Sequence, residues 1–383
     1  MASNCLAILG STGSIGVNAL KVVDGYPKRF KVVALSAYNN VALLKEQIKK
    51  YRPTYVAAKV ENLQELESEF RSLKVKFFDI EKGAAYLAGL KEIDTVLLAM
   101  RGAGALAPFL AAARAGNRIA PANKEALVIA GDILIKETRK HKAVIIPIDS
   151  EQSAIFQCLD GQKAPVKRIH LTASGGPLRD VPVKNFSKMT VKDILKHPRW
   201  RMGPKITVDS ATLMNKGFEF IEAQRLFGLS FDQVNIVVHP EAIIHSMVEF
   251  VDGSILAQLA VTDMRLPIQY ALTYPERLNT RLKALDLVEL KSLTFQKPDL
   301  KKFPALALAL EAAQRGGTMP CVLNAADEET VEAFLRGKIN FVSIYKTVEK
   351  VVCNHKIIKC PSLSDIYDAD EWARRKTREI LWR

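Results

Sequence analysis

Short apolar runs alternate with segments of helical periodicity through the N-terminal part of the chain. A continuous apolar run is typical of a strand buried on both faces. The alternation predicts a Rossmann-like, doubly wound parallel sheet. The predicted strands are Leu6 to Leu9, Phe30 to Leu35, Tyr55 to Ala58, Thr95 to Met100, Arg118 to Pro121 and Ala143 to Ile148, and the helices include Leu63 to Leu73, Ala105 to Ala115 and Leu127 to His141.

The C-terminal residues have apolar positions at helical spacing from Pro304 onward. In the last segment an amphipathic stripe is formed by Ile366, Ala369, Trp372, Ala373 and Ile380. We therefore expect a small helical bundle, preceded by a Lys- and Pro-containing connector. Its further predicted helices are Val322 to Leu335, Ile344 to Val352 and Ile366 to Leu381.

Size and charge narrow the class of protein. The chain has 383 residues, 48% of them hydrophobic, so two or three domains with an apolar core are expected. Lys and Arg outnumber Asp and Glu by 55 to 41, which gives a net charge of +14. This excess suits phosphorylated ligands, nucleic acid or anionic membranes, and a general bias in composition explains it equally well. Because the basic residues are scattered, small anionic ligands are favoured over nucleic acid.

The cysteines and the apolar runs indicate the compartment in which the protein is expected. Five cysteines, odd in number and without CxxC spacing, argue against a disulfide framework or a zinc site. The longest apolar run, Ala103 to Ala113, is well short of the ~20 residues that cross a bilayer. The first residues do not resemble a signal peptide. We expect a soluble, cytoplasmic protein with no membrane segment.

A glycine-rich loop follows the first predicted strand. Gly10, Gly13 and Gly16 lie between this strand and a helix, where backbone amides can hold a pyrophosphate. A plain glycine turn remains the alternative, since the spacing is GxxGxxG. The second strand ends in Ser36 to Asn40, which lacks the acid of an NAD site and so favours NADP, although it also lacks a basic residue for the extra phosphate.

Carboxylates gather in the middle of the chain. Asp149 and Glu151 follow a predicted strand, and in an extended chain residues two apart point the same way. Glu219 and Glu222 share a helix face at a spacing of three. Carboxylates without His or Cys select Mg²⁺ or Mn²⁺. For any single one of these acids, a helix cap or surface salt bridge is the alternative.

Two further segments suit a phosphate monoester. Leu171 to Pro177 places a hydroxyl beside two glycines, and Asp209 to Lys216 offers hydroxyls, an amide and an ammonium. Between them, His197 to Lys205 combines Trp, Gly and Pro, as in a loop that closes over a site. An ordinary connecting loop remains the alternative.

Eight motifs occur in one order along the chain. They are LGSTGSIG from Leu9, ANKEAL from Ala122, DSEQSAIFQ from Asp149, SGGP from Ser174, HPRWRMG from His197, VDSATLMNKGFEFIEA from Val208, VHP from Val238 and IHS from Ile244. Together they resemble the 1-deoxy-D-xylulose 5-phosphate reductoisomerase family. The resemblance covers essentially the whole chain and is most specific from Val208 to Ala223.

The resemblance implies an NADPH-dependent, metal-dependent enzyme of the non-mevalonate isoprenoid pathway. Its phosphosugar substrate rearranges to an aldehyde, which NADPH reduces to 2-C-methyl-D-erythritol 4-phosphate. The metal is Mg²⁺, Mn²⁺ or Co²⁺, and a homodimer is expected. The implied domains are a Rossmann-like NADPH-binding domain at 1–147, an α+β catalytic domain at 148–280 with a lid at 196–205, a linker at 281–303 and a helical domain at 304–383.

The resemblance also implies the residues of the site. Asp149, Glu151 and Glu219 match metal ligands, and Glu151, Lys124, His197 and Lys216 match catalytic positions. The substrate-binding positions are Ser150, Glu151, Ser174, His197, Trp200, Met202, Ser210, Asn215, Lys216, Glu219 and His245. The cofactor-binding positions are Thr12, Gly13, Ser14, Ile15, Ala37, Asn39, Asn40, Ala99, Asn123, Lys124, Glu125 and Gly203.

Two departures from the family and two rival functions accompany this interpretation. Gln152 replaces a histidine seen in some members, which indicates that this position is not required for chemistry. Tyr38-Asn39 stands where many relatives carry Gly and a basic residue near the 2′-phosphate, which predicts altered NADPH affinity or selectivity. Another two-domain NAD(P)-dependent sugar or semialdehyde dehydrogenase is the alternative enzyme, and it would need no carboxylate-bound metal. A basic nucleic-acid or scaffold protein is the second rival, and only the net charge supports it.

Overall fold

A computed structural model describes residues 3–100, 102–196, 200 and 202–382. The chain divides into two compact units, which interleave along the sequence. The first comprises Met1–Ala126, Leu134–Ser153 and Asp263–Leu282, and the second comprises Leu127–Ile133, Ala154–Thr262 and Lys283–Arg383. The four-part division expected from the sequence stays a prediction.

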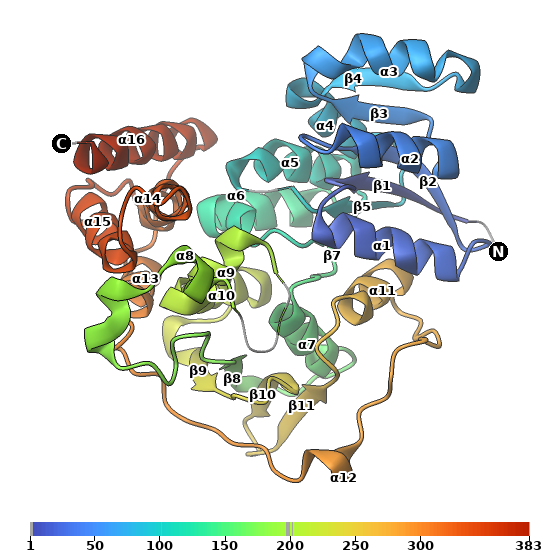
Figure 1. Cartoon of the computed structure of the whole chain (residues 1–383). Coiled ribbons are helices and arrows are strands. Elements are labelled where there is room, and N and C mark those ends of the chain that lie inside the picture. The colour runs from blue at the N-terminus through green and yellow to red at the C-terminus, as the bar shows by residue number, and fades with distance from the viewer. Residues whose placement is uncertain (1–2, 101, 197–199, 201, 383) are drawn as a thin grey trace. The chain divides into compact units, whose positions relative to one another are not determined.

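A seven-stranded parallel sheet forms the centre of the first unit (Figure 1). Its strand order is β4-β3-β2-β1-β5-β6-β7, so the order reverses between β1 and β5. In open sheets of this kind the crevice at the reversal receives the ligand. The strands are β1 (Asn4–Leu9), β2 (Phe30–Ser36), β3 (Tyr55–Ala58), β4 (Lys76–Asp79), β5 (Thr95–Leu98), β6 (Arg118–Pro121) and β7 (Val144–Ile145).

The predicted parallel sheet is confirmed, and its central strands are mostly apolar because both of their faces are buried. Leu6 to Leu9 of β1 have no exposed surface. The helices that accompany the sheet are α1 (Ser14–Gly25), α2 (Val41–Tyr51), α3 (Leu63–Glu69), α4 (Ile80–Ala88), α5 (Leu106–Ala115), α6 (Glu125–Lys140) and α11 (Arg265–Thr273), with single 3-10 turns at Val60–Asn62, Arg71–Leu73 and Gly102–Ala105.

The second unit contains a four-stranded sheet of order β11-β10-β8-β9. Strands β8 and β9 pair in parallel, and β10 is antiparallel to both β8 and β11. The strands are β8 (Val166–Ala173), β9 (Val234–Val238), β10 (Ile244–Phe250) and β11 (Ile255–Leu259). Helix α7 (Ser150–Leu159) begins in the first unit and enters the second at Ala154. The other helices of this part are α8 (Val191–Ile194), α9 (Pro204–Thr212) and α10 (Met214–Phe227), with 3-10 turns at Val183–Lys188 and Phe231–Gln233.

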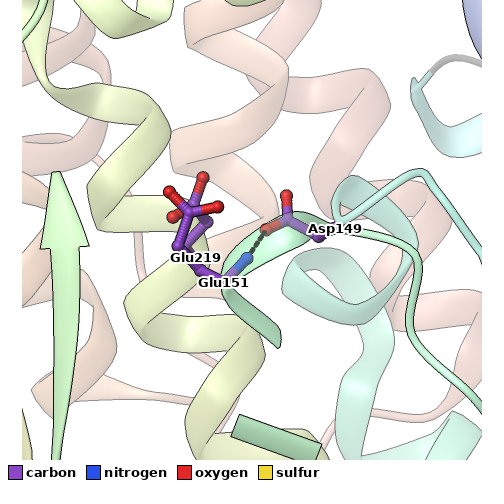
Figure 2. Close-up of side chains that lie close together, drawn as sticks. All are labelled: Asp149, Glu151 and Glu219. Carbon is purple, nitrogen blue, oxygen red and sulfur yellow. Dashed lines mark hydrogen bonds between the residues drawn. The ribbon is translucent and has the colours of Figure 1, made fainter. Parts of the chain in front are cut away.

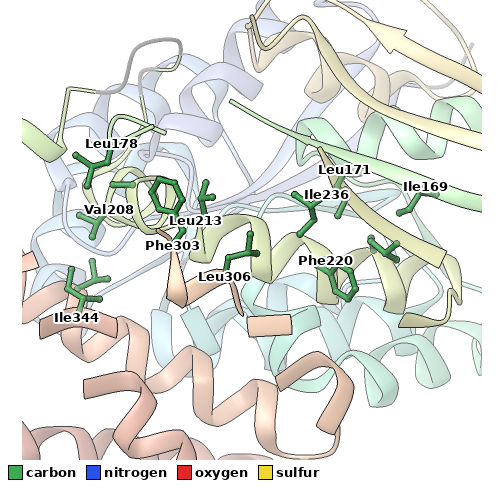
Figure 3. Packing of buried hydrophobic residues seen from close by; sticks show 14 of the residues in the cluster. Ile169, Leu171, Leu178, Val208, Leu213, Phe220, Ile236, Phe303, Leu306 and Ile344 are labelled. Carbon is green, nitrogen blue, oxygen red and sulfur yellow. The ribbon is translucent and has the colours of Figure 1, made fainter. Parts of the chain in front are cut away.

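One apolar core joins this sheet to the C-terminal helices within the second unit. Figure 3 shows Leu171 and Ile236 of the sheet in the same cluster as Phe220, Leu306 and Ile344 of the helices. Removing such side chains from water is the main stabilising contribution to a fold. The C-terminal helices are α13 (Pro304–Arg315), α14 (Met319–Leu335), α15 (Phe341–Cys353) and α16 (Leu363–Leu381), which confirms the predicted bundle.

The connector between α11 and α13 includes the short helix α12 (Leu287–Leu290). His239, directly after β9, contacts two residues of this connector. The imidazole is fully buried; its Nε2 accepts a hydrogen bond from the Ile243 amide at 3.2 Å, and its Nδ1 lies 2.9 Å from the Thr294 carbonyl oxygen. Its ring stacks on Phe295. The VHP motif therefore has a structural role here.

Among the described residues, no helix combines the length and apolar character needed to cross a membrane.

Candidate active site

Three carboxylates form a cluster that suits a divalent cation. Asp149, Glu151 and Glu219 each offer an oxygen atom, and these oxygens lie within 4.8 Å of one another. Figure 2 shows the three side chains converging. Donor sets made only of carboxylate oxygens fit Mg²⁺ or Mn²⁺, which keep other positions for water and substrate oxygens.

The start of helix α7 positions two of these acids. The Asp149 carbonyl accepts the Ser153 amide at 2.8 Å, and the Asp149 carboxylate accepts the Glu151 amide at 3.3 Å. Asp149 therefore caps the helix, a role in which a carboxylate also meets the positive end of the helix dipole. The hydroxyl of Ser150 donates to the carboxylate of Glu151.

The prediction that Asp149 and Glu151 continue an extended strand is wrong. Parallel pairing continues through the amides of Ile146 and Ile148, which donate to Ile119 and Pro121. Helix α7 then begins at Ser150. The two carboxylates converge because Asp149 folds back over the first turn of the helix, not because residues two apart share a face.

Lysines lie against the cluster. The Lys124 ammonium is 2.5 Å from Asp149 Oδ2, and both side chains are almost entirely buried. On helix α10, Lys216 Nζ donates to Glu219 Oε2, and Asn215 Nδ2 donates to Glu219 Oε1 at 2.6 Å. Two ammonium groups thus offset repulsion among three close carboxylates. Glu222, on the same helix face, is equally buried but is outside the cluster.

Two of the predicted phosphate residues, Asn215 and Lys216, contact Glu219. Asn215 and Lys216 are in the first turn of α10, and Ser210 is near the end of α9. Ser174 follows β8, where its hydroxyl accepts the Gly176 amide at 3.3 Å. Gly176, at φ +69°, lies so close to α9 that an added Cβ would be 2.3 Å from the Ser210 carbonyl oxygen. This contact holds the Ser174 loop beside Ser210.

The structure describes the predicted lid only in part, and His197 lies outside the described residues. The Trp200 ring lies 5.9 Å from the ring of His245, a buried residue of β10. Met202 is half-buried, and Gly203 is the N-cap of α9.

A buried ion cluster follows the lid. Lys205 Nζ lies 2.5 Å from Asp209 Oδ2 and 3.0 Å from Asp327 Oδ2. Burial raises the pKa of Asp327, and the positive charge of Lys205 acts in the opposite direction. Because Asp327 belongs to α14, these contacts fix the first turn of α9 to the C-terminal helices.

The loop between β1 and α1 lies against the end of β5, at the reversal of strand order. A Cβ at Gly10, at φ +91°, would stand 2.5 Å from the Ala99 carbonyl oxygen. Gly13 is the N-cap of α1 and has no side chain to cover the first amides of that helix. Thr12 is half-buried, Ser14 is exposed, and Ile15 is half-buried in the first turn.

Most of the other predicted cofactor residues follow β2 and β6, two further strands of the same sheet. Asn40 caps α2 through its side chain, which accepts the Leu43 amide at 3.0 Å. Ala37 is buried after β2, and Asn39 beside it is exposed. Asn123 donates to the Met100 carbonyl at 2.6 Å and accepts the Ala126 amide, which orders the start of α6 at Glu125.

Family models match the chain in three segments. They are described as 1-deoxy-D-xylulose 5-phosphate reductoisomerase for residues 6–131, as its C-terminal domain for residues 145–227, and as DXP reductoisomerase C-terminal domain for residues 259–376. Two relatives described as 1-deoxy-D-xylulose 5-phosphate reductoisomerase are from Synechococcus sp. (strain JA-2-3B'a(2-13)), 49% identical over 98% of this chain and 97% of the relative, and from Pelotomaculum thermopropionicum (strain DSM 13744 / JCM 10971 / SI), 48% identical over 98% of each.

The chain belongs to the 1-deoxy-D-xylulose 5-phosphate reductoisomerase family.

Solved structures of this family superpose on the chain. The reductoisomerase from Zymomonas mobilis in complex with NADPH has a TM-score of 0.92 and 38% identity over 99% of both chains. A second, in complex with NADPH, fosmidomycin and magnesium, has a TM-score of 0.93 and 39% identity, and covers 99% of this chain and 98% of its own. Membership in the reductoisomerase family does not favour the alternative of a sugar or semialdehyde dehydrogenase.

Two contacts near the glycine loop and the end of β2 involve residues outside the motifs. Gln47 of α2 exchanges buried hydrogen bonds with Ser11, at 2.6 Å and 3.0 Å, and so holds the glycine loop. Lys59, directly after β3, lies over the ring of Tyr38 after β2. Neither residue is in a motif, but the order of the parallel strands predicts that the ends of β2 and β3 are neighbours.

Proposed function

We propose that this chain converts 1-deoxy-D-xylulose 5-phosphate to 2-C-methyl-D-erythritol 4-phosphate, using NADPH and a divalent cation. The observation that carries the proposal is the carboxylate cluster of Asp149, Glu151 and Glu219, with Asn215 and Lys216 bound directly to Glu219. A metal site and a phosphate site then lie side by side, as a chelated ketose phosphate requires. The family and its structures with NADPH and magnesium support the same reaction.

The three acids fit the cation by charge, donor type and spacing, and would hold Mg²⁺, Mn²⁺ or Co²⁺. When bound, the cation supplies Lewis acidity that stabilises negative charge on the substrate oxygens. Lys124 keeps the Asp149 carboxylate in place, and Ser150 does the same for Glu151. Outer contacts of this kind orient the ligands of a metal. Glu151, Lys124, His197 and Lys216 are the proposed catalytic residues.

The proposed phosphate residues are Ser174, Ser210, Asn215 and Lys216. Binding the phosphate far from the reacting carbons contributes affinity and fixes the orientation of the substrate. In the proposed site Trp200, Met202 and His197 cover the substrate, and His245 supports the Trp200 ring from β10. Exclusion of water protects an aldehyde intermediate until it is reduced.

The proposed cofactor site follows the carboxyl ends of β1, β2, β5 and β6. NADPH supplies the hydride when it is bound there. The exposed first turn of α1 directs backbone amides toward the pyrophosphate. Thr12, Gly13, Ser14, Ile15, Ala37, Asn39, Asn40, Ala99, Asn123, Lys124, Glu125 and Gly203 are the proposed contacts.

We also propose a homodimer and a cytoplasmic location. Strand β11 is an edge strand, and its Ile255, Leu256 and Leu259 expose 51%, 40% and 37% of their surface. An exposed apolar edge strand pairs readily with another chain. The five cysteines are free, which suits a reducing compartment.

The test of the reaction is loss of NADPH absorbance on addition of 1-deoxy-D-xylulose 5-phosphate with Mg²⁺. We expect turnover by the unmodified chain, its loss in the presence of a chelator, and its recovery when Mg²⁺ is restored. Glu219→Gln removes one ligand charge and should lower turnover at least about 100-fold and weaken Mn²⁺ binding, measured by calorimetry.

Glu332→Gln is the matched control, since Glu332 is exposed on α14 and pairs only at the surface with Arg336. It should keep both turnover and Mn²⁺ affinity. Absence of turnover by the unmodified chain would refute the reaction. Undiminished Mn²⁺ binding by Glu219→Gln would refute the assignment of the metal site.

A further inference from the structure

The ends of strands β2 and β3 bring a cation and an aromatic ring together. The two strands are parallel neighbours, and beyond the last residue of β2 the Ala37 amide still donates to the Ala57 carbonyl at 3.1 Å. Tyr38 follows β2 and Lys59 follows β3. The Lys59 ammonium lies 4.3 Å from the centroid of the Tyr38 ring, which is 52% exposed. Both side chains therefore stand at the carboxyl edge of the sheet.

This edge is where a dinucleotide-binding sheet meets the adenosine ribose. The residue after the second strand contacts the 2′-hydroxyl of NAD, or a nearby cation accommodates the 2′-phosphate of NADP. Residues 36–40 contain no acid and no cation. Selectivity for the 2′-phosphate therefore needs a positive charge from another segment.

Lys59 is placed to provide that charge. Its ammonium is 3.7 Å from Glu61, longer than a charge-assisted hydrogen bond, and the Glu61 side chain is largely exposed. By contrast, the Lys45 ammonium on α2 is occupied by two carboxylates, those of Glu65 and Glu69. The ammonium of Lys59 thus retains donors for an incoming phosphate.

We propose that Lys59, held over the Tyr38 ring, binds the 2′-phosphate of NADPH and makes the enzyme select NADPH over NADH. The attraction between an ammonium and the face of an aromatic ring limits the rotamers of a long side chain before the ligand arrives. Tyr38 is therefore a positioning residue, and Lys59 contacts the cofactor. The inference rests on the proposed cofactor site and adds to it the residue that distinguishes the two cofactors.

Binding of small fragments separates the 2′-phosphate from the rest of the cofactor. Isothermal titration calorimetry on the full chain would give the Kd of NADPH, NADH, adenosine 2′,5′-bisphosphate and adenosine 5′-monophosphate. We expect Lys59→Gln to weaken NADPH and the bisphosphate about tenfold, which corresponds to about 1.4 kcal/mol. The Kd of NADH and of the monophosphate should change less than about twofold, because neither carries the 2′-phosphate.

Lys76→Gln is a matched control from the same sheet. Lys76 also lies over a tyrosine ring, that of Tyr55, at 5.8 Å, but at the amino ends of the strands. The substitution Lys76→Gln removes the same charge as Lys59→Gln does, and it should leave the Kd of all four ligands unchanged. Tyr38→Leu keeps the ammonium but not its support, so it should weaken NADPH by less than Lys59→Gln does and spare NADH.

The outcomes distinguish this inference from the proposed cofactor site. If the unmodified chain binds neither dinucleotide, the cofactor site and the inference both fail. If it binds NADPH and Lys59→Gln weakens NADPH and NADH equally, or weakens neither, only the role of Lys59 is refuted. Unchanged melting temperatures would show that the variants are folded.

Discussion

Gly176 determines how closely the two proposed phosphate-binding segments approach each other. Its φ of +69° is unfavourable for a residue with a side chain, and the nearest atom to an added Cβ is a backbone oxygen of Ser210. No change of rotamer can relieve that contact. A substitution must move the Ser174 loop or helix α9.

Gly176→Ala should therefore lower the free energy of unfolding by about 2–4 kcal/mol, from backbone strain and overpacking together. Gly161→Ala is the control, because Gly161 has a similar φ of +76° but open space around its Cβ position. It should cost only about 1 kcal/mol. Urea denaturation measures both, and equal losses would contradict the close approach.

At the scale of single residues, the sequence predicted only part of the candidate site. Residue type indicated a carboxylate site that included Glu222, and the family resemblance selected Asp149, Glu151 and Glu219 as its metal ligands. The sequence pattern assigned Asp149 and Glu151 to extended chain, because an apolar run says nothing of where a cap begins the next helix. Lys59 has no local signal, since its position beside Tyr38 depends on the pairing of two strands separated in sequence.

At the scale of elements, prediction was best for buried strands. The predicted bounds of β3 and β6 agree with the structure, because each is a four-residue run between polar segments. Strand β4 (Lys76–Asp79) was not predicted, because it is at the edge of the sheet and is only partly buried. Its short mixed sequence has neither a continuous nor an alternating apolar pattern.

The packing of α15 against α16 predicts a pH dependence of stability. After α15, the His355 ring packs on Trp372 of α16, and its Nε2 lies 2.7 Å from the Thr318 hydroxyl. Burial lowers the pKa of His355, and the charge of Arg315 acts in the same direction. The folded state therefore disfavours the protonated ring.

Because the folded pKa is below the unfolded value of about 6.5, the contribution to stability is complete above that value and is lost as pH falls through the folded pKa. The free energy of unfolding should fall less in His355→Gln than in the unmodified chain between neutral pH and about pH 5. Denaturation at each pH measures the difference. Parallel pH profiles would contradict this prediction.

At the scale of the molecule, the net charge of +14 suits its proposed phosphorylated substrate and cofactor. The sequence supplied the family through ordered motifs that span the chain. It could not supply the interface of the expected dimer, because an edge strand is recognised only once the strand order is known. Once the strand order is known, the exposed apolar side chains of β11 indicate where the proposed dimer forms.

Leu256→Lys combined with Leu259→Lys should place charges on this edge and dissociate the proposed dimer. Light scattering after size exclusion should show a mass of about 85 kDa, twice the 42.5 kDa of one chain, for the unmodified protein, and 42.5 kDa for the variant. Val183→Lys, at a residue that is 55% exposed on a 3-10 turn, should not change the mass. A monomeric unmodified protein would refute the dimer.

The buried contacts of His239 determine where the connector between α11 and α13 tolerates added residues. His239 contacts Thr294 and Phe295, and Val238 pairs with Gln296. These contacts divide the connector into two shorter loops. The entropy lost on closing a loop grows only slowly, by about 0.6 kcal/mol for each doubling of length. Added residues between Arg281 and Ser292 would therefore be tolerated thermodynamically, whereas the same insertion at the fastened residues would break the contacts that hold the connector in place.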